Sequence, residues 1–149
     1  MDKSLPEALA LLPHGPEFRF IDRLLSLEAG KRAVAEYKVP LDHAFLRGHF
    51  PGQPLFPGVL LIEAAAQLAG IVAQSDPTVP PLGNLKLAGV RAVKFTGSAR
   101  PGQVIRVESA LTGRLANVVS ATGAAWVEDQ PVLRAELTLS GEITRPDSR

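Results

Sequence analysis

The chain has 149 residues, of which 46% are hydrophobic and 21% charged, with a formal net charge of +1 and no cysteine. This composition is ordinary for a globular protein, and the length fits one domain. The sixteen lysines and arginines are scattered rather than gathered in the basic stripe of a nucleic-acid-binding protein, and the lack of cysteine excludes disulfides, thiolate catalysis and cysteine-based zinc sites.

The N-terminal part predicts a short helix over residues 6–12 and two strands, over residues 18–27 and 33–39. In the second strand Ala33, Ala35 and Tyr37 alternate with polar or charged neighbours, the pattern of a half-buried strand. The first residues match neither a signal peptide nor a transit peptide, so we expect a cytoplasmic protein.

A stiff loop is expected before the central apolar run. Pro51, Pro54 and Pro57 recur every third residue, and Gly52 and Gly58 follow two of them. Because Gly58 has no side chain and stands where a helix begins, its free N–H is a candidate donor to a carbonyl oxygen that gains negative charge.

Residues 55–73 are almost free of polar side chains. The run is about as long as a bilayer span, but Pro57 interrupts its start, Glu63 and Gln67 fall in its middle, and no basic cluster flanks it. We therefore expect no membrane insertion and predict a buried helix over residues 59–74. At 3.6 residues per turn, Glu63, Gln67 and Gln74 share one polar stripe on this helix.

Two interpretations of Glu63 remain open at this point. In the first it has a structural role, hydrogen-bonded to a strand or marking the solvent edge of the helix. In the second its apolar surroundings favour the protonated carboxyl, which then acts as an acid, and Gln67 at i+4 fixes its orientation.

After a proline-rich break over residues 75–81, the pattern predicts strands over residues 83–96, 103–112, 117–127 and 132–140, and a loose tail over residues 144–149. Strands on both sides of one buried helix indicate an α+β protein in which an antiparallel sheet wraps around that helix. Residues 1–149 are expected to form this single domain.

The three histidines, His14, His43 and His49, show no metal-ligand spacing with carboxylates, and no glycine-rich phosphate loop is present. We expect neither a metal nor a cofactor. His14 and His43 lie near no acid in a recognisable motif, so a surface or hydrogen-bonded structural role is expected for both.

Residues 48–52 (GHFPG), 57–64 (PGVLLIEA) and 66–67 (AQ) resemble the signature of the bacterial (3R)-3-hydroxyacyl-[acyl-carrier-protein] dehydratases, which have the hotdog fold. The resemblance runs from about residue 11 to residue 139. A sister group that also isomerises the double bond has Asp on the helix, so Glu63 favours the dehydratase-only branch.

The chain departs from the family pattern in two segments. Residues 15–18 (GPEF) stand where the family has Arg-Tyr-Pro-Phe, which leaves substrate gating open. Residues 96–99 (TGSA) replace a basic stretch, which leaves open the docking of the carrier protein.

The resemblance implies dehydration of a 3-hydroxyacyl thioester on acyl carrier protein. His49 suits the base, Glu63 the acid and the backbone N–H of Gly58 the oxyanion donor, while Gln67 holds Glu63. The resemblance also implies a homodimer in which His49 of one subunit meets Glu63 of the other, with a trimer of dimers left open.

Two further sets of residues are candidates for substrate and partner contacts. The apolar side chains that would line the acyl tunnel, with plain core packing as the equal alternative, are Phe50, Leu55, Phe56 and Leu60. The cations that would dock the acidic carrier protein, with ordinary surface charge as the alternative, are Arg91, Lys94 and Arg100.

Two other functions compete with dehydration. The same fold hosts acyl-thioester hydrolases, in which the helix acid would activate water without His49. A non-catalytic acyl-binding partner subunit of a dehydratase is the second, although the presence of both His49 and Glu63 argues against a pure binder.

Overall fold

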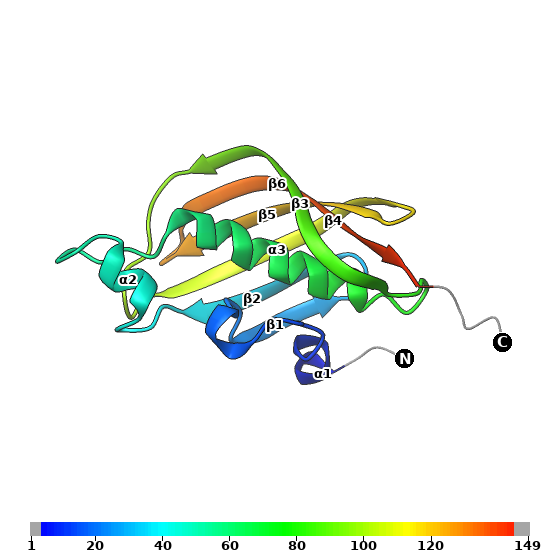
Figure 1. Ribbon diagram of the computed structural model, residues 1–149, viewed down its shortest axis with the longest axis horizontal. Helices are drawn as coiled ribbons and strands as arrows, with labels where there is room; N and C mark the ends of the chain where they lie inside the picture. The colour runs from blue at the N-terminus through cyan, green and yellow to red at the C-terminus, as the bar shows by residue number, and fades with distance from the viewer. Residues whose placement is uncertain (1–3, 145–149) are drawn as a thin grey trace.

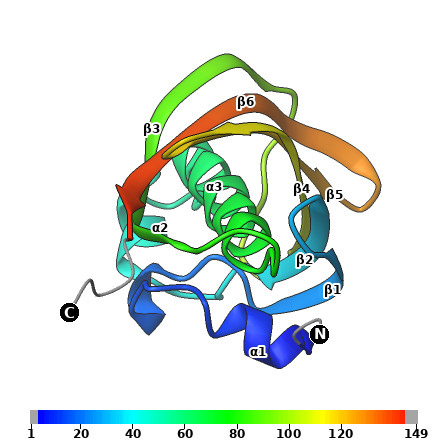
Figure 2. The same ribbon diagram turned by 90° about the vertical axis from the view of Figure 1, so that its right-hand side faces the viewer.

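The computed structural model describes residues 4–144, in which one six-stranded antiparallel sheet curves around a long helix, α3 (Gly58–Gln74) (Figure 1, Figure 2). The strands lie in the order β1-β2-β4-β5-β6-β3. This confirms the α+β layout expected from the sequence. The strands are β1 (Arg23–Glu28), β2 (Arg32–Lys38), β3 (Leu82–Phe95), β4 (Val104–Leu115), β5 (Val118–Val127) and β6 (Gln130–Ile143). The short helices are α1 (Leu5–Leu9), η1 (Pro16–Phe18) and α2 (Ala44–Gly48).

Helix α3 is apolar on nearly every side because the sheet surrounds it (Figure 2). Where it crosses β5 the two backbones lie close together, since a Cβ added to Gly123 would lie 2.6 Å from Cβ of Ala65. On β4 the buried hydroxyl of Ser109 donates to the carbonyl of Ala65 at 2.7 Å. Among residues 4–144 no helix combines the length and apolar character needed to cross a bilayer.

The strands after α3 present alternate residues to the helix. In β4, Ile105, Val107 and Ser109 are buried, and in β6 the inward positions include Leu137 and Leu139. These are the core-facing residues that the period of two predicts. Strand β3, in contrast, lies at the edge of the sheet and is exposed over residues 91–95.

The predicted strand over residues 18–27 is wrong in its first half, because β1 begins only at Arg23. Pro16 starts a 3-10 turn, and Gln67 of α3 then bonds the carbonyl of Phe18 and the N–H of Phe20. With these groups bonded to the helix, the segment crosses α3 instead of pairing with a strand. In Figure 2 it passes below α3, on the side that the sheet leaves open.

Helix α2 is not predicted by the sequence pattern. The imidazole of His43 caps its N-terminus by accepting from the N–H of Phe45 at 3.4 Å, so His43 has the structural role expected for it. The predicted loose tail begins at Thr144, whose hydroxyl donates to the carbonyl of Pro81 at 2.9 Å, and its other residues lie outside the described part of the chain.

Candidate active site

Glu63 lies in the second turn of α3 on the polar stripe that the sequence predicts. Its side chain is 22% exposed, whereas Gln67, one turn later, is buried. The amide of Gln67 donates to Oε2 of Glu63 at 3.1 Å. Farther along the helix, the amide of Gln74 bonds both the N–H and the carbonyl of Leu82.

The amide of Gln67 has a fixed orientation because three groups bond it. Its Oε1 accepts from the N–H of Phe20 at 2.9 Å, and its Nε2 donates to the carbonyl of Phe18 at 2.8 Å as well as to Glu63. If the amide oxygen and nitrogen were exchanged, the NH₂ group would face the N–H of Phe20 and the oxygen would face the carbonyl of Phe18. Neither hydrogen bond could then form. The contact with Glu63 is therefore made by an N–H and not by the amide oxygen.

His14 lies beside the same carboxyl, with its Nε2 3.5 Å from Oε2 of Glu63. The sequence shows no motif that joins His14 to an acid, but the fold brings the two side chains together. No periodicity links the two residues, since they are 49 positions apart and belong to a loop and a helix. The family resemblance, which begins at about residue 11, was the available signal.

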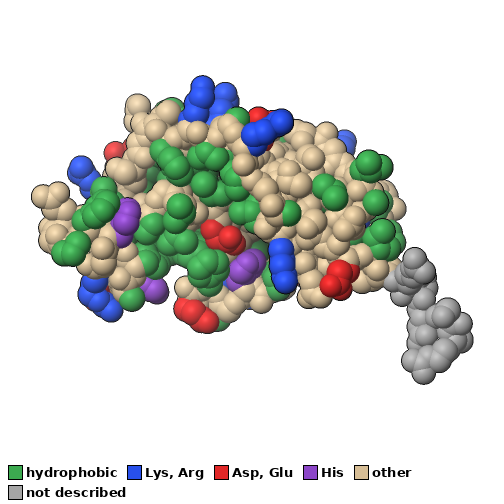
Figure 3. Space-filling model, turned by 45° about the horizontal axis from the view of Figure 1, so that its top comes forward, with side chains coloured by type: hydrophobic (Ala, Val, Ile, Leu, Met, Phe, Trp, Pro, Cys, Tyr) green, Lys and Arg blue, Asp and Glu red, His purple; other side chains and the backbone are tan. Residues whose placement is uncertain are grey.

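A hollow of about 520 Å³ opens beside Glu63 between the N-terminal segment, α3 and β3. On the molecular face in Figure 3, hydrophobic side chains surround a recess where a histidine adjoins an acidic side chain. The hollow is lined by Leu11, Leu12, Pro13, His14, Phe18, Glu63, Ala66, Gln67, Gly70, Ile71, Gln74, Asn84, Leu85, Lys86, Leu87 and Leu139. Its mainly apolar wall, with one carboxyl, three amides, an imidazole and a lysine, suits an acyl chain that has polar groups at one end.

His49 caps the end of α2 and begins the proline-rich loop. Its Nδ1 lies 3.2 Å from the carbonyl oxygen of Leu55, and its ring stacks on Phe50 with centroids 4.1 Å apart. A carbonyl oxygen only accepts, so Nδ1 carries the proton in this contact and Nε2 keeps a lone pair. Nε2 is thus the nitrogen of His49 that has no hydrogen bond to another group in residues 4–144.

The loop after His49 is held by backbone bonds and by an aromatic cluster. The N–H of Leu55 donates to the carbonyl of His49 at 2.7 Å, and the N–H of Phe56 donates to the carbonyl of Ala99 at 2.8 Å. The ring of Phe56 is 2% exposed and packs against Phe20, Tyr37 and Phe45 at centroid distances of 5.6–5.9 Å. This cluster, which we call the aromatic cluster, joins the N-terminal segment, β2, α2 and the loop.

Tyr37 is the member of the aromatic cluster that titrates. Burial raises the pKa of its phenol to about 12, and the negative charge of Asp22 adds to the rise. The phenol is therefore neutral over the whole range in which an imidazole and a carboxyl exchange protons.

Gly58 stands at the first position of α3, after Pro57. No hydrogen bond from its N–H to any group in residues 4–144 is found. A Cβ at this position would lie 2.9 Å from the ring of Phe95, so the glycine allows β3 to approach the start of the helix. The predicted oxyanion donor thus has a free N–H beside an exposed aromatic ring.

The other predicted site residues fall in different environments. Phe50 is 53% exposed and Leu55 and Leu60 are half-buried, whereas Phe56 is a core residue of the aromatic cluster. No hydrogen bond or ion pair joins His49 to Glu63 within residues 4–144 of the single protomer.

The predicted docking cations are all exposed. Arg91 forms an ion pair with Glu136 at 3.1 Å, while Lys94 faces the outer side of the sheet. Arg100 lies in the loop before β4, where its backbone N–H donates to the side chain of Gln103.

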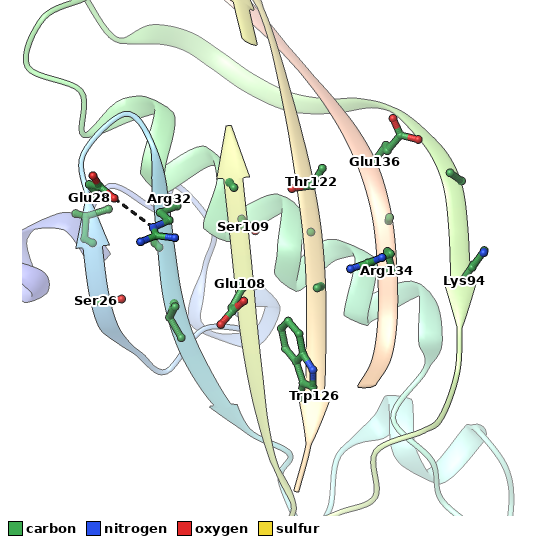
Figure 4. A pocket seen from close by; sticks show the side chains of 18 residues that line it. Ser26, Glu28, Arg32, Lys94, Glu108, Ser109, Thr122, Trp126, Arg134 and Glu136 are labelled. Atoms are coloured by element: carbon green, nitrogen blue, oxygen red, sulfur yellow. Dashed lines mark hydrogen bonds and ion pairs between the residues drawn. The ribbon is translucent and has the colours of Figure 1, made fainter. Parts of the chain in front are cut away.

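A larger hollow, about 920 Å³, lies on the outer face of the sheet, away from α3 (Figure 4). Charged side chains from several strands border it, including Glu28, paired with Arg32 at 3.2 Å, and Glu108 and Arg134. It is open and highly charged, and it contains neither Glu63 nor His49. We therefore take the hollow beside Glu63 as the candidate active site.

Comparison with known proteins shows which family this chain resembles. A protein-family model described as a FabA-like domain matches residues 12–136. The chain is 39% identical over 144 residues to a "3-hydroxyacyl-[acyl-carrier-protein] dehydratase FabZ" of Chloroflexus aggregans, covering 96% of this chain and 97% of the relative. It is 36% identical over 143 residues to the protein of the same name from Roseiflexus castenholzii, covering 95% and 99%.

Among solved structures, the fold is similar to that of a chain in the dehydratase heterocomplex ApeI:P of Xenorhabdus doucetiae. The TM-score is 0.76 at 16% sequence identity, with 95% of this chain and 93% of the other covered. At that identity the likeness concerns the fold alone.

Proposed function

The chain belongs to the FabA-like family, and from this membership we propose that it dehydrates 3-hydroxyacyl thioesters carried on acyl carrier protein, using Glu63 and His49. It is a hydro-lyase of fatty-acid biosynthesis, and the product is the 2-enoyl thioester. The observation that supports this most is Glu63, held by Gln67 in the wall of an apolar hollow. We treat residues 1–149 as one catalytic domain.

The reaction needs a base, an acid and a donor to the thioester oxygen. Nε2 of His49 takes the proton from the carbon next to the thioester carbonyl, and the carboxyl of Glu63 gives a proton to the leaving hydroxyl, which departs as water. The N–H of Gly58 donates to the carbonyl oxygen while negative charge builds on it. Proton transfer from His49 back to Glu63 through water then restores the starting state.

We propose that the two groups meet across a homodimer. Neither bonds the other within one protomer, and a long edge strand, β3, leaves its outer side without a partner strand in residues 4–144. Val90, Val93 and Phe95 on this strand are 41%, 36% and 50% exposed. Pairing of two β3 edges about a two-fold axis would cover these side chains and place the loop of one protomer near α3 of the other.

In the dimer, Phe50, Leu55 and Leu60 are the proposed contacts of the acyl chain. Phe56 is the weakest of the four tunnel candidates, since its ring packs on Phe20, Tyr37 and Phe45.

The proposed partner is acyl carrier protein. Arg91, Lys94 and Arg100 are the proposed docking cations, of which Arg91 is already paired with Glu136. The cytoplasmic location and assembly into a trimer of dimers stay predictions.

The test is to incubate the protein with a 3-hydroxyacyl thioester and with the saturated thioester, both on acyl carrier protein. We expect enoyl thioester from the first substrate, seen as the absorbance of the conjugated product, and free thiol from neither. Free thiol from both, without enoyl product, would identify a hydrolase instead. Binding of both without any reaction would identify a non-catalytic acyl-binding subunit.

A further inference from the structure

We propose that His14 is a positioning residue for Glu63. Together with Gln67 it holds one carboxyl oxygen, Oε2, so that the proton for the leaving hydroxyl is carried by the other, Oε1. The inference rests on the proposed function, because His14 acts through the acid of that reaction and touches no reacting atom.

The two oxygens of Glu63 have unequal surroundings. Oε2 receives the amide N–H of Gln67 at 3.1 Å and lies 3.5 Å from Nε2 of His14. Oε1 has no hydrogen-bond partner in residues 4–144. It is also not among the unpartnered side-chain atoms that are buried, so it is accessible. It is therefore open to the hollow, while two nitrogen atoms occupy the surroundings of Oε2.

The position of the proton on His14 follows from the other side of its ring. Nδ1 is buried and has no hydrogen-bond partner in the described residues. A proton there would be a buried donor without an acceptor, an arrangement that folded proteins avoid. The proton of the neutral ring is then on Nε2, the atom that faces Oε2 of Glu63.

The ring of His14 is fixed by its own loop. The guanidinium of Arg19 donates to the carbonyl of His14 at 2.7 Å and to that of Leu12 at 3.3 Å. The imidazole stacks on Phe18 at a centroid distance of 6.1 Å, and the carbonyl of Phe18 is bonded to Gln67. Gln67 therefore contacts Glu63 directly and is linked to His14 through Phe18.

The consequence for the reaction is geometric. Oε2 of Glu63 already faces an N–H of Gln67 and the N–H of His14. If the proton of the carboxyl were also on Oε2, three hydrogen atoms would crowd this one oxygen. Because Gln67 donates to Oε2 and Nε2 of His14 faces the same oxygen, the proton resides on Oε1, which is the oxygen that substrate can reach. The 3.5 Å separation is long for a hydrogen bond, and such contacts often shorten when substrate binds.

Two substitutions of the same residue test the proposal. His14→Phe keeps a ring that stacks on Phe18 but removes the N–H, while His14→Gln places an amide N–H at a similar reach. We expect kcat of the Phe variant to fall about tenfold, with KM changed less than about twofold, and the Gln variant to recover most of the rate. A wild-type kcat in His14→Phe, or equal losses in both variants, would overturn the proposal.

A readout independent of activity separates this proposal from the proposed function. The chain has three histidines, so their ring nitrogens can be followed individually by NMR. We expect Glu63→Gln to shift the ring resonances of His14 and to leave those of His43 in place. If wild-type protein makes no enoyl product, the proposed function fails, and an unshifted His14 in this spectrum would also reject the positioning role.

Discussion

At the scale of single residues, the candidate site depends on which atoms are already bonded. His49 has its Nδ1 bonded to the carbonyl of Leu55, which leaves Nε2 free, and the N–H of Gly58 has no bond to another described group. Both free atoms belong to the proline-rich loop and its junction with α3. The proposed reaction therefore uses atoms of the loop as well as of the helix.

Replacing Gly58 tests the proposed role of its N–H. Gly58→Pro removes the donor, and proline suits the first position of a helix after the extended Pro57, whose ψ is 131°. Gly58→Ala is the matched control, because it adds the same Cβ beside Phe95 but keeps the N–H. We expect kcat of the Pro variant to be about 10²-fold below that of the Ala variant. Equal rates in steady-state assays would show that the N–H is not used.

The sequence could predict some of these contacts and not others. The bond between Glu63 and Gln67 follows from their spacing of four on a helix, and this prediction is confirmed. The contact between His14 and Glu63 depends on how a loop crosses α3, which no local pattern encodes. The same is true of the bond from His49 to Leu55, which depends on the course of the loop.

At the scale of elements, the hydrophobic periodicity of the sequence predicted α3 and most strands of the sheet. It failed where the backbone bonds a side chain instead of a neighbouring strand. Phe18 and Phe20 are apolar and alternate as in a strand, yet their backbone groups bond the amide of Gln67. Helix α2 was missed because five residues are too few for a helical period to be seen. In the first case a tertiary contact determined the local structure, and in the second the segment was too short to show a period.

The aromatic cluster, which joins four segments around the loop of His49, contains the chain's single tyrosine, and this allows a direct pH measurement. The pKa of Tyr37 is about 12 in the folded protein and near 10 when unfolded. Its contribution to the free energy of unfolding is therefore constant below pH 10 and falls as pH rises from 10 through 12, because only the unfolded phenol loses its proton in that range. We expect the absorbance titration of native protein to have its midpoint near 12, and that of protein in urea near 10. Asp22→Asn should lower the native midpoint only in part, because burial is the larger cause. A native midpoint near 10 would mean that the cluster is open to water.

At the scale of the whole molecule, the sequence predicted a sheet around a helix but not the order of the strands. Strand β3 follows α3 in the chain but pairs with β6 at the edge of the sheet, whereas β2 pairs with β4. These pairings join strands that are far apart in the sequence, and they depend on how the chain crosses α3. The edge position of β3 is nevertheless what makes the proposed dimer possible.

Mixing two inactive variants tests whether the site forms between protomers. His49→Ala and Glu63→Gln should each lower kcat by about 10²-fold or more, since each removes a proton-transfer group. When the two are co-expressed, random pairing gives heterodimers in half of the molecules, each with one complete site. We therefore expect about a quarter of the wild-type activity.

Size-exclusion chromatography of each variant controls for loss of the dimer in this experiment. No recovery of activity from a mixture that does exchange subunits would place the two groups in one protomer instead.

The outer face of the sheet has a consequence for how the protein can be observed. The only tryptophan, Trp126, lies on that face (Figure 4). The guanidinium carbon of Arg106 is 4.9 Å from the centre of its ring. The sheet separates this indole from α3 and the recess beside Glu63. Intrinsic fluorescence will therefore respond to quenchers and ligands that reach the exterior, and an acyl chain that enters the interior will leave the emission nearly unchanged.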